Sequence, residues 1–142
     1  MDARHYLSQA RLLNNRIKSY ENELEYINAL AFGPSGPYYG PDKIKGPPNL
    51  QAPFIRYLDK IFELEKIIND EIDKLIQLKQ QISKTIAEIN DPKLELILRE
   101  RYINCRNWED IAFDLAYSQV YLFKLHLKAM QLVKVPQEYS KV

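Results

Sequence analysis

The sequence predicts an all-α protein, in which an N-terminal antiparallel coiled-coil helical hairpin is followed by a C-terminal helix-turn-helix. Three observations predict this fold. Apolar residues recur at helical spacing along two long segments, the four glycines are confined to the window between them, and shorter apolar periods follow Pro92. With 142 residues, the chain has room for one ordinary domain or two small ones.

The first helix is predicted over about residues 3–30. Its apolar positions step alternately by four and three residues, as on one face of an amphipathic helix: Tyr6, Ala10, Leu13, Ile17, Tyr20, Leu24, Ile27 and Ala31. Residues 32–50 then hold all four glycines and five of the eight prolines. Because proline removes backbone donors and glycine raises the entropic cost of ordering, we expect a mobile loop there.

The second helix is predicted over residues 53–90 and has the strongest pattern in the sequence. One apolar set recurs every seven residues (Phe54, Ile61, Ile68, Leu75, Ile82 and Ile89), and a second set lies between its members (Leu58, Leu64, Ile72, Leu78 and Ile86). Such a seam needs a partner, and the first helix, folded back by the loop, is the nearest one. The hairpin therefore accounts for residues 1–91. Because the second helix is the longer one, its unmatched seam predicts self-association, most simply as a dimer.

Residues 92–135 are predicted to form the helix-turn-helix. Asp91-Pro92 ends the long helix, because proline disfavours helix at the preceding residue and suits the first turn of a new one. Three helices are expected, over residues 93–103, 108–115 and about 119–133. Their inward residues are Leu94, Ile97, Leu98 and Tyr102, then Trp108, Ile111, Ala112 and Leu115, then Leu122, Leu125, Ala129 and Leu132. Residues 136–142 are expected to be a flexible tail.

Catalysis and metal or cofactor binding are not expected. The sequence lacks the common phosphate-loop, dinucleotide, nucleophile-elbow and zinc-protease motifs. An acidic run on the long helix (Glu63, Glu65, Asp70, Glu71 and Asp73) is not accompanied by histidines at metal-binding spacing, so we expect a solvated helix face. The chain has one cysteine and no apolar stretch of membrane-spanning length. We therefore expect a cytoplasmic, non-enzymatic protein without a membrane partner.

The last helix is the best candidate for contact with double-stranded DNA. The net charge of the whole chain is only +1, yet Leu115 to Lys134 contains three lysines and no acid. In the first turn, Gln119 can bond adenine, and Val120 or Tyr121 can meet a thymine methyl, although core packing stays open for Val120. The candidate interface is completed by Lys124, Lys128 and Arg106 for phosphates, and by Ser118 at the helix N-cap.

Several short stretches resemble region four of bacterial sigma factors. They are Arg101-Tyr102-Ile103, Trp108-Glu109-Asp110-Ile111-Ala112, Tyr117-Ser118, Leu125-His126 and Ala129-Met130. The whole plan is similar to that of small Gram-positive phage and prophage regulators that carry this domain, the ArpU- and RinA-like proteins. The resemblance implies a transcriptional regulator in the bacterial cytoplasm, whose hairpin dimerises or contacts RNA polymerase.

A second interpretation needs no DNA. The hairpin can belong to a coiled-coil adaptor or to a phage assembly component, with the C-terminal helices only capping the rod. A small terminase subunit also joins DNA binding to a helical oligomeriser, but in that family the helix-turn-helix usually comes first. The two interpretations differ in whether the lysines of the last helix meet phosphates or merely face water.

Overall fold

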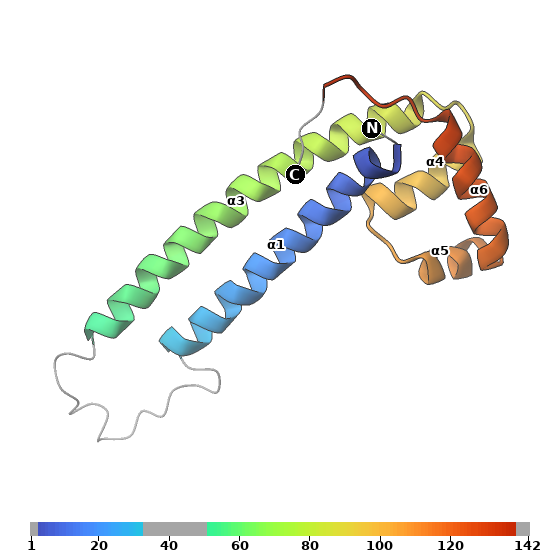
Figure 1. Ribbon diagram of the computed structural model, residues 1–142. Coiled ribbons are helices and arrows are strands. Elements are labelled where there is room, and N and C mark those ends of the chain that lie inside the picture. The colour runs from blue at the N-terminus through green and yellow to red at the C-terminus, as the bar shows by residue number, and fades with distance from the viewer. Residues whose placement is uncertain (1–2, 33–50, 139–142) are drawn as a thin grey trace. The chain divides into compact units, whose positions relative to one another are not determined.

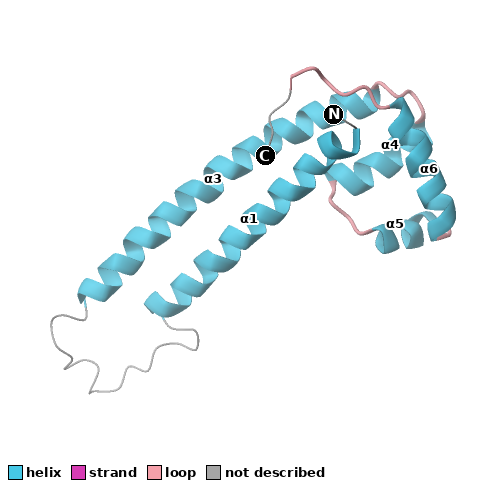
Figure 2. Ribbon diagram, in the orientation of Figure 1, coloured by secondary structure: helices cyan, strands magenta, loops and turns pink. Residues whose placement is uncertain are grey.

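The computed structural model describes residues 3–32 and 51–138, and in this part of the chain every regular element is helical (Figures 1 and 2). The elements are α1 (Ala3–Phe32), α3 (Gln51–Ala87), α4 (Pro92–Leu98), η2 (Arg99–Ile103), α5 (Trp108–Leu115) and α6 (Gln119–Leu132). The predicted all-α class is confirmed. The loop predicted over residues 32–50 lies outside the described residues except for Phe32, as do the last four residues of the predicted tail.

The chain forms two compact units. One combines Met1–Asn15 with Asp73–Val142, and the other is Arg16–Ile72. This division differs from the boundary expected near Pro92. The difference arises because the first turns of α1 and the last turns of α3 pack with the C-terminal helices, so each long helix contributes to both units.

The unit Arg16–Ile72 is an antiparallel helix pair. Its buried residues are Ile27 from α1 and Ile61 and Leu64 from α3, and the partly buried residues packed on them are Tyr20, Leu24, Ala31, Tyr57 and Leu58. At one end the ring of Phe32 meets the edge of Phe54, with centroids 5.3 Å apart. Arg16, near the other end, pairs with Glu71. The two contacts show that α1 and α3 run in opposite directions along the pair.

Two positions in the heptad pattern are exchanged relative to the prediction. Ile72 was expected in the seam but is 36% exposed, whereas Glu71, expected on the solvated face, is only 5% exposed. Both predictions are wrong for these residues. A straight helix with 3.6 residues per turn drifts from a strict seven-residue repeat, so the inward position moves along the rod. Arg16 supplies the opposite charge that allows a carboxylate to occupy it.

The second unit brings the start of α1 against the C-terminal helices. Tyr6, Leu7, Ala10 and Leu13 of α1 are fully or almost fully buried, as are Ile82 and Ile86 of α3. The Tyr6 hydroxyl lies 3.0 Å from the Thr85 hydroxyl, a buried hydrogen bond between the two helices. The C-terminal core of this unit consists of Ile97, Ile111, Ala112 and Leu122, with Trp108, Leu115, Tyr117 and Leu125 packed on it.

The connection from α3 to α4 contains the helix break predicted at Pro92, and Asp91 caps the next helix. The helix α3 ends at Ala87, three residues before the predicted end, and Asn90 takes a left-handed conformation with φ 60°. The Asp91 carboxylate accepts hydrogen bonds from the amides of Lys93 (3.1 Å) and Leu94 (3.3 Å), and Pro92 lies in the first turn. The single helix predicted over residues 93–103 is α-helical only to Leu98. Its last turn is the wider π-helix η2.

Two classes of feature are missing from the described ranges 3–32 and 51–138. No helix there combines the length and the apolar character that crossing a bilayer requires. The same residues contain no cluster of three His, Cys, Asp or Glu side chains placed to hold a metal ion.

Candidate nucleic-acid interface

Helices α5 and α6 are joined by a tight, fully capped turn. Ala116 takes a left-handed conformation with φ 57°, and the Tyr117 amide donates to the Ala112 carbonyl at 2.9 Å, which closes the end of α5. Ser118 is extended, and its hydroxyl accepts a hydrogen bond from the Tyr121 amide at 3.1 Å. The predicted N-cap is confirmed. The turn therefore fixes the direction in which the first turn of α6 leaves α5.

The inner face of α6 is anchored in the core. Leu122 and Ala129 are fully buried, and His126 between them is 4% exposed. Leu125 is partly buried against the same core, as predicted. Leu132, predicted for this stripe, is instead 46% exposed, because α6 ends there and no other helix of the described residues covers its last turn. Packing thus fixes the rotation of α6 over its first three turns.

The outer face of α6 carries five of the predicted contact residues. Gln119, Val120, Tyr121, Lys124 and Lys128 are all exposed. The exposed fraction of Val120 is 67%, which excludes the alternative of core packing within this chain. No acidic residue lies on α6. These five residues combine one amide, two side chains with apolar surface and two lysines, and Phe123 and Leu127 on the same helix are also exposed.

Arg106 stands apart from this face. Its guanidinium donates to the Glu100 carboxylate at 2.6 Å and also pairs with the carboxylate of Asp114. These two partners, Glu100 foremost, raise the pKa of Arg106 above its usual value. The charge of Arg106 is therefore matched within the protein, and we leave this residue out of the phosphate contacts proposed below.

The structure adds a lysine that sequence reasoning did not find. The Lys93 ammonium donates to the Tyr121 hydroxyl at 2.6 Å and lies 5.0 Å and 5.2 Å from the ring centroids of Tyr121 and Tyr117. The two rings meet edge to face, 4.9 Å apart. The hydrogen bond to Tyr121 is the main cause of a raised pKa at Lys93, which stays charged. No local sequence pattern could have indicated this, since 28 residues separate Lys93 from Tyr121.

Apolar side chains are also exposed on this part of the molecule. Phe113 on α5 is 86% exposed, and Leu127 on α6 is 58% exposed.

Comparison with known proteins assigns no relative: no protein-family model, no curated protein and no solved structure matches the chain significantly. The site must therefore be interpreted from its own geometry.

Proposed function

We propose that the protein is a phage-type, sequence-specific DNA-binding transcriptional regulator, with the first turn of α6 in the major groove. The observation that carries the proposal is the pair of opposite faces of α6. One face is locked in the core by Leu122, His126 and Ala129, while the other exposes lysines and no acid. A helix presented in this way has the dimensions that the major groove admits.

The exposed residues divide into two roles. Lys124 and Lys128 lie one turn apart on α6 and contact phosphates, which fixes the register of the helix on the duplex. Gln119 in the first turn bonds a base edge, and adenine is the base whose donor and acceptor match its amide. Lys93, held against the rings of Tyr117 and Tyr121, adds a third phosphate contact near that turn.

The role in transcription rests on the resemblance to region four of sigma factors. In that interpretation the helix pair provides dimerisation or contact with RNA polymerase. Ile55 and Phe62 support an intermolecular role for α3, because they lie one heptad apart and are 53% and 62% exposed. A dimer would place two copies of α6 on adjacent half-sites of DNA.

The proposal is tested by charge reversal on α6. Duplexes selected from a random library by the wild-type protein are labelled, and binding is followed by fluorescence anisotropy at three salt concentrations. Lys124→Glu and Lys128→Glu should weaken binding to every duplex and reduce the slope of log affinity against log salt by about 0.9 per lost contact. Gln119→Ala should cost about 1–3 kcal/mol on the selected duplex and little on random DNA.

Lys66→Glu is the matched control, because Lys66 is exposed on α3 and undergoes the same change of charge. It should leave the salt slope unchanged. The proposal is wrong if the wild-type protein enriches no sequence, or if the α6 variants bind as tightly as the control.

A second candidate function is that of a protein-binding adaptor. The exposure of Phe113 and Leu127 favours it, since large apolar side chains at the surface commonly mark contact with another protein. It predicts that the wild-type protein binds no duplex and self-associates through these two side chains, not through Ile55 and Phe62, in sedimentation experiments. Phe113→Ser together with Leu127→Ser should then abolish association without lowering the melting temperature.

A further inference from the structure

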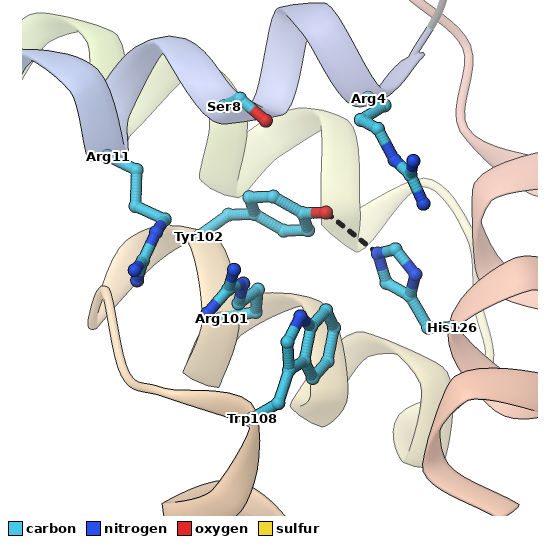
Figure 3. Close-up of a pocket in the computed structure, with 7 residues that line it drawn as sticks. All are labelled: Arg4, Ser8, Arg11, Arg101, Tyr102, Trp108 and His126. Atoms are coloured by element: carbon cyan, nitrogen blue, oxygen red, sulfur yellow. Dashed lines mark hydrogen bonds between the residues drawn. The ribbon is translucent and has the colours of Figure 1, made fainter. Parts of the chain in front are cut away.

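A cavity of about 380 Å³ opens between the first turns of α1 and the elements η2, α5 and α6. Figure 3 shows three arginines among the residues that line it. Arg4 and Arg11 come from α1, and Arg101 comes from η2. None of the described residues that line this cavity is acidic. The cavity lies wholly within the unit formed by Met1–Asn15 and Asp73–Val142.

Two of the three guanidinium groups are held in place by neutral partners. Arg11 donates to the Cys105 carbonyl at 3.0 Å and to the Arg106 carbonyl at 3.4 Å. Arg101 donates to the same Arg106 carbonyl at 3.0 Å, and its guanidinium lies 4.6 Å from the ring centroid of Trp108. A carbonyl or a ring orients a guanidinium without cancelling its charge, and each Arg has five N–H donors. The positive charge of the cavity therefore remains uncompensated.

The ionisation of neighbouring groups reflects this positive potential. Burial and the charge of Arg11 lower the pKa of Arg101. Burial lowers the pKa of His126 to about 4, and the charges of Arg4 and Arg101 act in the same direction. His126 is thus neutral at pH 7, and its Nε2 lies 2.7 Å from the Tyr102 hydroxyl (Figure 3).

We infer that this cavity binds a small ligand carrying a phosphate-type oxyanion. The forked guanidinium matches the geometry of phosphate oxygens, and three guanidinium groups line this cavity, two from α1 and one from η2. The Ser8 hydroxyl adds a donor, and Trp108 forms an aromatic wall suited to an organic group. The volume lies in the range of small-molecule sites, about 300–1,000 Å³. A bound oxyanion would compensate the repulsion among the arginines.

The cavity is separate from the proposed DNA-binding face. His126 lines the cavity, whereas Lys124 and Lys128 lie two residues before and after it on α6. A separation of two residues rotates the side chain by roughly 200° around the axis of an α-helix. The inference therefore goes beyond the proposed function and does not depend on it. Because the ligand would join α1 to η2 and α6, its binding should stabilise this unit.

The protein carries its own reporter for this site. Trp108 is the only tryptophan of the chain and lines the cavity, so its fluorescence reports binding directly. The wild-type protein is titrated with inorganic phosphate and with pyrophosphate, while chloride keeps the ionic strength constant. We expect a saturable change, with a dissociation constant on the order of 1 mM or below, and a melting temperature that rises with either anion.

Arg4→Gln is the informative variant. Arg4 is exposed and forms no ion pair with another described residue, so its removal should spare the fold. It should weaken binding of both anions by at least about fivefold, since one charge-assisted contact is lost. Arg56→Gln, the matched control, removes an arginine of α3 that is also exposed and should leave the affinity unchanged.

Three results would overturn the inference. The first is a response that does not saturate, or that chloride reproduces. The second is an Arg4→Gln variant that binds phosphate as the wild type does, or an Arg56→Gln variant that loses binding equally. The third is a loss of DNA salt dependence in Arg4→Gln without any saturable phosphate response, which would assign the arginines to the DNA backbone. Saturable phosphate binding without DNA binding would support the cavity site and contradict the proposed function alone.

Discussion

Arginines occupy two contrasting environments in this protein. In the helix pair Arg16–Ile72, Arg16 meets the carboxylate of Glu71, whose side chain is only 7% exposed. In the other unit, Arg4, Arg11 and Arg101 surround a cavity whose described lining contains no acid. An arginine whose charge is paired with a carboxylate therefore contributes to the fold. Arginines that face no acid imply a ligand that would supply the negative charge.

The matched pair is itself incompletely satisfied. Nε of Arg16 and Oε2 of Glu71 are buried without a hydrogen-bond partner among the described residues. A pair of this kind contributes little net stability compared with two packed apolar residues, but removing one partner leaves a buried charge alone. Arg4 at the cavity has the opposite property, because its removal relieves repulsion and leaves no described carboxylate unpaired. The following predictions test this contrast.

The largest change in unfolding free energy is expected from Arg16→Met. The substitution keeps most of the apolar volume of the side chain and leaves Glu71 as an unpaired charge in the helix pair. The unfolding free energy should fall by about 3 kcal/mol, measured by urea denaturation. The double variant Arg16→Met/Glu71→Leu should recover most of this loss, because it removes both charges together. A single variant as stable as the wild type would mean that the pair does not constrain the fold.

An intermediate change in unfolding free energy is expected from the protonation of His126. Its pKa is about 4 in the folded protein, against about 6.5 in an unfolded chain, so below pH 6.5 the unfolded state binds more protons. Stability contributed by this group is therefore complete above pH 6.5 and is lost as the pH falls towards 4. Because the imidazole also lines an open cavity, where solvent screens its charge, we expect the unfolding free energy to fall by about 2 kcal/mol. This is less than the full shift of the His126 pKa implies.

The His126→Gln variant isolates this contribution from that of the carboxylates. Denaturation of both proteins at pH 7 and at pH 4.5 should give a smaller acid loss for the variant, which has no imidazole to protonate. Equal losses in the two proteins would assign the acid sensitivity to other groups.

The smallest effect on stability is expected from Arg4→Gln, in contrast to Arg16→Met. Arg4 raises the cost of charging His126, so its removal should move the pKa of His126 upward, which NMR titration of the imidazole resonances can measure. The unfolding free energy should change by less than about 0.5 kcal/mol, with any gain largest at low salt. A large destabilisation would show that Arg4 contributes to folding as Arg16 does.

Local features of this fold could be predicted from the sequence. Seven-residue spacing placed Ile61, Ile68 and Leu75 inside the helix pair or its continuation, and all three are buried. Pro92 and Ser118 marked the starts of two helices, because the fixed φ of proline and an N-cap hydroxyl each act only on neighbouring residues. The inward residues of α4 and η2 were predicted for the same reason, since helical periodicity is a local property.

The charges, in contrast, could be placed only by tertiary structure. Helical periodicity and turn residues were enough to place the helices, the Ser118 cap and most of the apolar face of each helix. They did not determine that Glu71 is buried in place of Ile72, that Lys93 packs on Tyr117 and Tyr121, or that Arg4 and Arg101 face one cavity. The physical reason is that apolar burial follows a short-range period, whereas the partner of a charge is set by whichever distant element the packing brings beside it.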